Sequence, residues 1–161
     1  MAKAIDIKLQ EGDPAPSFHS INQHEQSIGL SDFKGKHVIL YFYPRDNTPG
    51  CTKEACAFRD AIAQLESMGV VVLGVSCDNV SSHQKFISKF ELPFDLLADT
   101  SQEIVKAYGV WGPKQFMGKT FDGIHRVSFW INPEGLIERI WTKVKPDLHA
   151  TEVIEAIKAF E

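Results

Sequence analysis

Cysteine is scarce in this sequence, since only three occur among 161 residues. Three cysteines are too few for a disulfide scaffold, so an apolar core has to stabilise the chain. No apolar run approaches the roughly 20 residues that a membrane-spanning helix needs. The opening segment, MAKAIDIKLQEGDPAPSF, also lacks the apolar stretch of a secretory signal. These absences predict a cytoplasmic protein whose cysteines are reduced and available for redox chemistry, catalysis or metal binding.

A large excess of one charge is also missing. The formal net charge is −4 and the sequence pI is about 5.9, which gives no electrostatic reason to expect nucleic acid or an anionic membrane as a partner. Hydrophobic residues make up 43% of the chain, as in ordinary globular proteins, which argues against extensive disorder. No internal repeat or long linker divides the chain, so we expect a single domain over residues 1–161.

The order of the apolar segments indicates an α/β protein. Residues 1–36 are rich in turn formers and predict short strands and loops laid against a later core. Apolar runs and helical spacing then predict, in chain order, a strand at 37–43, a helix at 49–68, a strand at 70–76, a helix at 80–90, a short strand near Leu96, a helix at 101–108, a strand hairpin at 127–131 and 136–141, and a helix at 151–160. This order predicts a thioredoxin-like fold with a central mixed β-sheet flanked by helices.

The segment that joins the first long strand to the first long helix carries the clearest chemical signal. Thr48 is suited to the N-cap position, and Pro49 is suited to the first helical position. Cys51 therefore falls in the first helical turn, close to unpaired backbone N–H groups and to the positive end of the helix dipole. Both features favour the thiolate form of a cysteine. This position predicts a reactive thiol.

Cys56 lies five residues after Cys51. In a continuous helix, five residues leave the two Cα atoms about 8.6 Å apart, whereas a disulfide needs Cα atoms within roughly 7 Å. A disulfide between these cysteines would therefore require residues 49–57 to unwind. Taken alone, Cys56 is better explained as a small buried apolar residue than as a reactive thiol. The C-x4-C spacing does not fit a zinc site without a second Cys/His cluster.

Pro44-x3-Thr48-x2-Cys51 resembles the active-site motif of the peroxiredoxins, P-x3-[T/S]-x2-C. The longer stretch YPRDNTPGCTKEAC resembles the Q-type branch, also called bacterioferritin comigratory proteins. Four other segments match the same branch, namely GDPAPSF, VVVLGVSCD, YGVWG and GIHRVSFWINPEG. The resemblance covers residues 11–160 and implies a thioredoxin-like fold. It also implies a thiol peroxidase that reduces hydrogen peroxide and organic hydroperoxides without metal, haem or flavin.

The resemblance implies a role for each residue of the motif. Cys51 would be the peroxidatic nucleophile, which attacks the peroxide and becomes a sulfenic acid. Thr48 would orient the peroxide through its hydroxyl group, and Pro44 would form a wall of the pocket. Arg126 would stabilise the thiolate and the charge that develops on the leaving oxygen. The backbone N–H groups of Gly50 and Cys51 would be further donors.

The resemblance also implies that Cys56 is the resolving cysteine. Cys56 would attack the sulfenic acid of Cys51 to give an intramolecular disulfide, which thioredoxin would then reduce. The branch further implies a monomer. Cys77 matches no resolving position of the family and is expected to be a packed thiol at the end of a strand, with a resolving role as the lesser alternative.

Two other functions stay open on these residues. A thiol–disulfide oxidoreductase on the same fold would carry C-x-x-C at the helix start, and the C-x4-C spacing counts against it. A non-enzymatic peroxide sensor would use the same unwinding to signal to a partner. Among the remaining polar residues, the six histidines show no metal-ligand spacing, and Asp46 and Glu54 are candidates for tuning the site electrostatically. His125 adjoins Arg126 but, as its neighbour on a strand, is expected to point to the opposite face.

Overall fold

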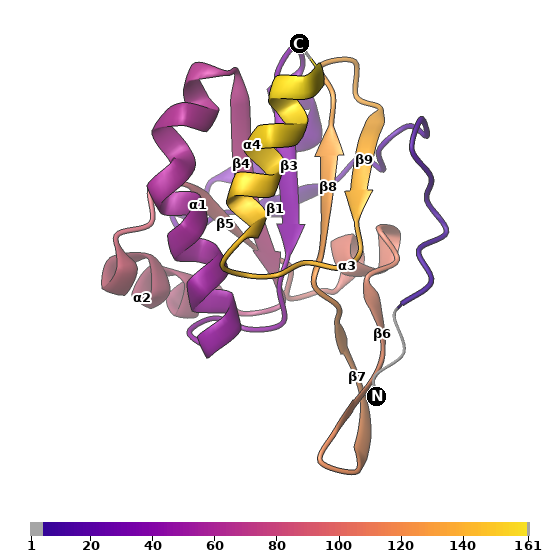
Figure 1. Ribbon diagram of the computed structural model, residues 1–161. Coiled ribbons are helices and arrows are strands. Elements are labelled where there is room, and N and C mark those ends of the chain that lie inside the picture. Colours follow the sequence, from indigo (N-terminus) through magenta and orange to yellow (C-terminus); the bar gives the residue numbers. More distant parts are fainter. Residues whose placement is uncertain (1–4, 161) are drawn as a thin grey trace.

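A five-stranded sheet forms the centre of the protein in the computed structural model, which describes residues 5–160 (Figure 1). In spatial order, its strands are β5 (Asp95–Ala98), β4 (Val70–Ser76), β3 (His37–Phe42), β8 (Val127–Ile131) and β9 (Ile137–Trp141). The strands β3, β4 and β5 run parallel, whereas β8 pairs antiparallel with both β3 and β9. The predicted mixed sheet is therefore confirmed.

Helices cover both faces of this sheet. They are α1 (Pro49–Ser67), α2 (Val80–Phe90), α3 (Glu103–Ala107) and α4 (His149–Phe160). Apolar residues of α1 and α4, together with Phe86 of α2, pack on one face, and those of α3 pack on the other. The predicted thioredoxin-like arrangement is confirmed, although the helix predicted at 101–108 occupies only 103–107 and the last helix begins at His149 rather than at 151.

Short elements surround the sheet. The N-terminal part contributes β1 (His19–Ile21), β2 (Ser27–Gly29) and a 3-10 helix, η1 (Leu30–Phe33), as predicted for residues 1–36. Residues 1–4 belong to the opening segment that was expected to lack a secretory signal, and they lie outside the described residues. Tyr108, which follows α3, is fully buried, and its hydroxyl group donates to the carbonyl oxygen of Pro16 at 2.7 Å. This contact ties the N-terminal part to the body of the protein.

A second hairpin, which was not predicted from the sequence, follows α3. It consists of β6 (Trp111–Phe116) and β7 (Lys119–Ile124), and it projects from the body of the protein (Figure 1). Its two-residue turn, Met117–Gly118, has positive φ at both positions, as a type I′ turn requires. Met-Gly is not the usual signal for such a turn. Most side chains of the hairpin are exposed, so neither strand shows the alternation of a half-buried strand.

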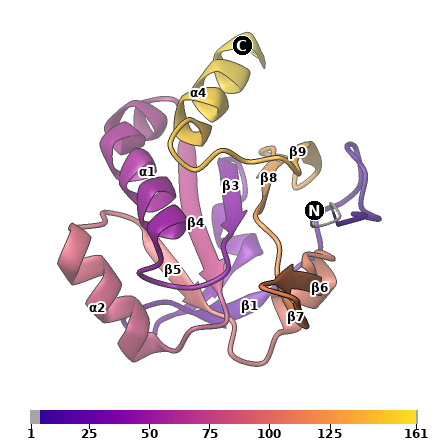
Figure 2. The same cartoon turned by 60° about the horizontal axis from the view of Figure 1, so that its bottom comes forward.

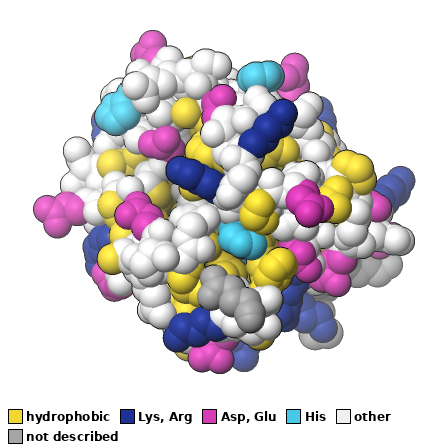
Figure 3. All heavy atoms as spheres, turned by 90° about the horizontal axis from the view of Figure 1, so that it is seen from above, with side chains coloured by type: hydrophobic (Ala, Val, Ile, Leu, Met, Phe, Trp, Pro, Cys, Tyr) yellow, Lys and Arg dark blue, Asp and Glu magenta, His cyan; other side chains and the backbone are white. Residues whose placement is uncertain are grey.

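The start of α1 lies at the end of the sheet where β3 and β4 finish. Figure 2 brings this end forward and shows α1, α2 and the hairpin of β6 and β7 around it. The opposite end, where the carboxyl terminus lies, shows positively and negatively charged side chains interspersed (Figure 3). Within residues 5–160, no helix combines the length and the apolar character that crossing a membrane would demand.

A close approach between β4 and its neighbours yields a stability prediction. A Cβ atom added to Gly74 would lie 2.7 Å from Cδ2 of Leu96 and 2.9 Å from Cζ of Tyr41, and both of these side chains are buried. We therefore expect Gly74→Ala to lower the free energy of unfolding by about 1–3 kcal/mol through overpacking. Urea denaturation measures this change. An unchanged stability would mean that the ring of Tyr41 can move aside.

Candidate active site

The connection between β3 and α1 places Cys51 in the first turn of α1. Thr48 occupies the N-cap position with extended backbone angles, and Pro49 follows it in the first helical turn, as predicted. The predicted side-chain cap is wrong, however. The hydroxyl group of Thr48 donates to the carbonyl oxygen of Arg45 at 3.1 Å rather than accepting from the helix. Pro44 lies in the same connection and is half-buried.

Arg126 reaches the sulfur of Cys51 from the segment that leads into β8. Its Nη2 atom lies 3.2 Å from Sγ, and only 1% of the Cys51 surface is exposed. A guanidinium group carries a fixed positive charge, so it stabilises a thiolate at this position. The structure therefore brings together two predicted site residues that lie 75 residues apart in the sequence.

Glu54 is the third member of this group. Its Oε1 atom accepts a hydrogen bond from Nη1 of Arg126 at 2.7 Å, and its side chain is fully buried. Burial raises the pKa of Glu54 to about 7, although the charge and hydrogen bonding of Arg126 act in the opposite direction. Burial alone would lower the pKa of Arg126, but the nearby Glu54 and Cys51 raise it overall. The guanidinium group of Arg126 thus stays protonated, because Glu54 and Cys51 both favour its charged form.

Gly50 allows the guanidinium group to lie close to the helix backbone. A Cβ atom added there would meet Nη2 of Arg126 at 3.2 Å, which is closer than most side chains tolerate. The first hydrogen bond of the helix runs from the N–H of Thr52 to the carbonyl oxygen of Thr48. The N–H groups of Gly50 and Cys51 precede it, where a helix has no internal acceptors. They are therefore suited to receive an oxygen of a ligand.

The other two cysteines occupy different surroundings. Cys56 is half-buried on α1, and the helix is continuous from Cys51 through Cys56, with both thiols free. Cys77 follows β4 and packs against the apolar core on the face away from α1. Burial, followed by the charges of Asp99 and Asp78, raises the pKa of the Cys77 thiol to about 11. The expectation of a packed thiol at the end of a strand is confirmed.

Lys114 is a neighbour of the site that the sequence analysis missed. Its Nζ atom donates to the carbonyl oxygen of Ile124 at 2.8 Å, across the hairpin. Burial lowers the pKa of Lys114, the charge of Arg126 lowers it further, and Cys51 raises it. These effects show that the hairpin lies within electrostatic reach of the site. The polar, exposed sequence of the hairpin gave no signal of this proximity.

Two of the histidines are buried, and each lies within hydrogen-bonding distance of other side chains. His83 is fully buried beside Asp46. His149 lies with Nε2 at 2.8 Å from Oγ of Ser128. His125 lies with Arg126 in the connection between β7 and β8 rather than within a strand, and its ring faces the carbonyl oxygen of Pro113. Among the residues described, no cluster of three or more His, Cys, Asp or Glu side chains is arranged to hold a metal ion.

This geometry supports nucleophilic chemistry at sulfur. The sulfur of Cys51 at the start of a helix faces a fixed cation, and N–H groups that have no acceptor within the helix lie beside it. The same donors can stabilise negative charge on an oxygen atom that leaves during the reaction. Glu54 fixes the cation from behind, so the guanidinium group is oriented before a substrate arrives.

The chain is similar to known proteins over most of its length. Residues 11–140 match the AhpC/TSA family. Peroxiredoxin Bcp of Escherichia coli is 43% identical over 150 residues, which cover 93% of this chain and 96% of that protein. Peroxiredoxin Bcp of Bacillus subtilis is 41% identical over 152 residues, covering 94% and 97%. A crystal structure of a mutant of PrxQ from Xylella fastidiosa superposes with a TM-score of 0.90 at 34% identity, covering 94% and 97%.

The raised pKa of Glu54 predicts a pH-dependent contribution to stability. Between the ordinary pKa of 4.5 and the folded value of about 7, the folded protein keeps a proton that the unfolded chain has lost. The free energy of unfolding therefore falls as pH rises through this window. Glu54→Gln removes the titrating group, so we expect the stability of the variant relative to the wild type to rise by up to a few kcal/mol across the window.

Urea denaturation between about pH 4.5 and about pH 8 measures this difference. Glu66→Gln is the matched control, because Glu66 is an exposed glutamate near the other end of α1. Its stability should follow that of the wild type at every pH. Parallel curves for Glu54→Gln and the wild type would contradict the assignment of the buried titrating group.

Proposed function

Since the chain belongs to the AhpC/TSA family and is a peroxiredoxin, we propose that Cys51 is the peroxidatic nucleophile of a thiol peroxidase. The contact between Nη2 of Arg126 and Sγ of Cys51, at 3.2 Å, is the observation that carries this proposal. Peroxiredoxins reduce hydroperoxides by cysteine chemistry. A related bacterioferritin comigratory protein from Xanthomonas campestris has been described for its alkyl peroxide reduction activity, and we extend that substrate class to this chain.

The proposed reaction begins with the thiolate of Cys51 attacking one oxygen of the hydroperoxide. A sulfur–oxygen bond forms, the O–O bond breaks, and the leaving alkoxide or hydroxide takes up a proton to become an alcohol or water. The sulfur is oxidised to a sulfenic acid. Arg126 and the N–H groups of Gly50 and Cys51 would stabilise the leaving oxygen. Thr48 would orient the substrate through its hydroxyl group, and Pro44 would shield the pocket.

Cys56 is the proposed resolving cysteine. Its thiolate attacks the sulfur of the sulfenic acid, a disulfide forms, the S–O bond breaks, and the leaving hydroxide takes up a proton to become water. Since α1 is continuous between Cys51 and Cys56, the first turns of the helix must unwind for the two sulfur atoms to meet. Cys77 is less suited to this step, because its pKa of about 11 keeps it protonated near neutral pH.

A dithiol protein completes the proposed cycle by reducing the disulfide through exchange. We infer that thioredoxin is this reductant, because an intramolecular disulfide is the substrate that a protein dithiol reduces by two successive exchanges. Resolution within one chain requires no second subunit, which supports a monomer. Chemistry that needs free thiols suits the cytoplasm. Since the proposed site uses residues from β3, α1 and the start of β8, we also propose that residues 1–161 act as a single domain.

The alternative functions are less well supported. A thiol–disulfide oxidoreductase lacks its expected C-x-x-C, since Cys51 and Cys56 are separated by four residues. A non-enzymatic sensor differs from a peroxidase only in turnover. The family assignment favours the peroxidase.

Cysteine variants test the proposed cycle. We expect Cys51→Ser to abolish thioredoxin-coupled hydroperoxide consumption, because the nucleophile is lost. Cys56→Ser should still consume one equivalent of hydroperoxide rapidly and then stop, because thioredoxin has no disulfide to reduce. Cys77→Ser is the matched control and should turn over like the wild type. Activity retained in Cys51→Ser would reject the nucleophile, and sustained turnover in Cys56→Ser would shift the resolving role to Cys77.

Unwinding can be followed directly. After one equivalent of hydroperoxide, peptide mapping should find a disulfide between Cys51 and Cys56. Hydrogen exchange should then lose protection over residues 49–57, because those amides leave the helix. Residues 59–67 at the other end of α1 are the internal control and should stay protected. A disulfide at these positions with unchanged protection would show that the helix tolerates the bond.

A further inference from the structure

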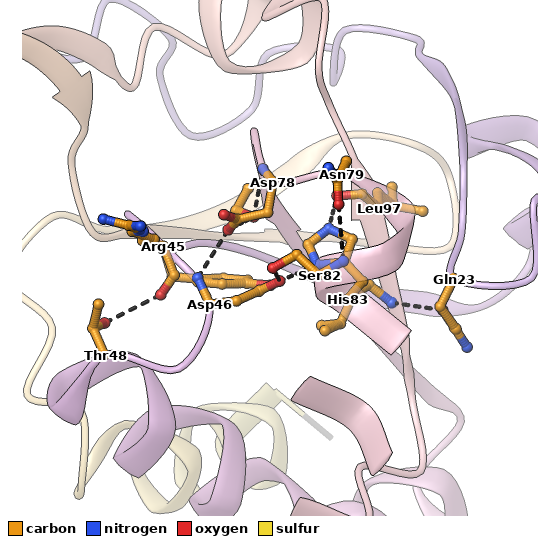
Figure 4. Close-up of polar contacts among 12 residues, drawn as sticks. Gln23, Arg45, Asp46, Thr48, Asp78, Asn79, Ser82, His83 and Leu97 are labelled. Atoms are coloured by element: carbon orange, nitrogen blue, oxygen red, sulfur yellow. Dashed lines mark hydrogen bonds and ion pairs between the residues drawn. The ribbon is translucent and has the colours of Figure 1, made fainter. Parts of the chain in front are cut away.

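A buried polar cluster lies behind the connection that carries Pro44 and Thr48 (Figure 4). Its centre is the carboxylate of Asp46. The Oδ1 atom accepts a hydrogen bond from the hydroxyl group of Tyr43 at 2.6 Å. The Oδ2 atom accepts from Oγ of Ser82 at 2.8 Å and faces Nδ1 of His83 at 2.7 Å. Three side chains thus hold one carboxylate, and two of them belong to α2.

His83 connects this carboxylate to the sheet. Its ring is fully buried, and Nε2 lies 3.0 Å from the carbonyl oxygen of Leu97 in β5. Both neighbours of the ring are acceptors. The ring therefore bridges the carboxylate of Asp46 and the backbone of β5. The cluster thereby fixes the connection between β3 and α1 against α2 and β5.

The peptide group between Arg45 and Asp46 is held at both ends. Its N–H donates to Oδ2 of Asp78 at 2.8 Å, and Asp78 also accepts from Oγ of Ser76 at 2.6 Å. The carbonyl oxygen at the other end of the same peptide group accepts from the hydroxyl group of Thr48 at 3.1 Å. Because a peptide group is planar, rotating it would break both hydrogen bonds together.

This arrangement determines which way the hydroxyl group of Thr48 faces. A threonine hydroxyl has one hydrogen and two lone pairs. Its hydrogen is committed to the carbonyl oxygen of Arg45, so its lone pairs remain for a donor on the other side. A hydroperoxide carries such a donor in its O–H group. The hydroxyl group is therefore set to accept from the substrate rather than to donate to it.

We propose that Asp78, Asp46 and His83 are positioning residues for the peroxidase reaction. They hold the peptide group between Arg45 and Asp46 so that the hydroxyl group of Thr48 accepts the O–H of the hydroperoxide. This inference rests on the proposed role of Thr48 in substrate binding. None of the three residues touches the sulfur or the substrate, so each acts through the orientation of Thr48.

The test compares two reactions of Cys51, both measured in single turnovers in the Cys56→Ser background. Reduction of a hydroperoxide needs an oriented substrate, whereas alkylation by iodoacetamide reports only the reactivity of the thiolate. We expect Asp78→Ala and His83→Leu to slow hydroperoxide reduction by about 10- to 100-fold, as misplacement of an orienting group does. Alkylation should be unchanged. A merely structural defect would slow both reactions.

A double-mutant cycle connects the effect to Thr48. We expect Thr48→Val to slow hydroperoxide reduction, and we expect Asp78→Ala to cause no additional loss when Thr48 is already valine. His83→Asn retains a donor toward Asp46 and should restore most of the rate lost in His83→Leu. Gln84→Ala is the matched control on α2, since the side chain of Gln84 donates to the carbonyl oxygen of Gln23, outside the cluster. It should behave like the wild type.

The outcomes separate this inference from the proposed function. If Thr48→Val slows the reaction but Asp78→Ala does not, or if their losses multiply, the positioning role is overturned and the role of Thr48 stands. If Thr48→Val reacts at the wild-type rate, both the role of Thr48 and the inference built on it fall. Equal slowing of alkylation and peroxide reduction by Asp78→Ala also overturns the inference. If His83→Leu does not fold, the measurements on Asp78→Ala decide.

Discussion

The guanidinium group of Arg126 holds the site together, because it bonds to two groups of α1 at once. One nitrogen contacts the sulfur of Cys51 and another contacts the carboxylate of Glu54. The pairing of β3 with β8 makes this possible, since Phe42 lies opposite Val127 and Arg126 directly precedes Val127. A shift of one residue in this register would turn the side chains of β8 to the other face and displace the cation. The chemistry of the helix start therefore depends on a strand pairing far along the chain.

Fixing the cation has an electrostatic cost that falls on Glu54. Its Oε2 atom is buried without a hydrogen-bond partner among residues 5–160, and burial raises the pKa of this carboxyl group to about 7. An exposed carboxylate would avoid this cost, but it would hold Arg126 weakly, because exposed ion pairs contribute little. The buried pair of Glu54 and Arg126 therefore lowers the free energy of unfolding, but it orients the guanidinium group before substrate binds.

Local signals explain what the sequence could predict. The apolar runs at 37–43 and 70–76 marked β3 and β4, and Thr48 with Pro49 marked the start of α1, because each signal depends on adjacent residues. Arg126 carries no local signal and was identified only by resemblance. Asp46 and His83 lie 37 residues apart, and no spacing rule marks partners that meet through tertiary packing. The hairpin of β6 and β7 was missed because most of its side chains are exposed, so it lacks the pattern of a half-buried strand.

The same contacts divide the proposed site into a fixed part and a labile part, and the boundary lies at Thr48. Residues before it are held by the cluster around Asp46, whereas residues 49–57 must leave the helix if Cys51 is to reach Cys56. Unwinding would free both partners of Arg126 together, because Cys51 and Glu54 lie on the same turns. Glu54 would then return to water and lose the burial that raised its pKa. Hydration of the Glu54 carboxylate would offset part of the free energy lost when the helix unpacks. Glu54 therefore orients Arg126 in the reduced protein and also lowers the free-energy cost of unwinding residues 49–57.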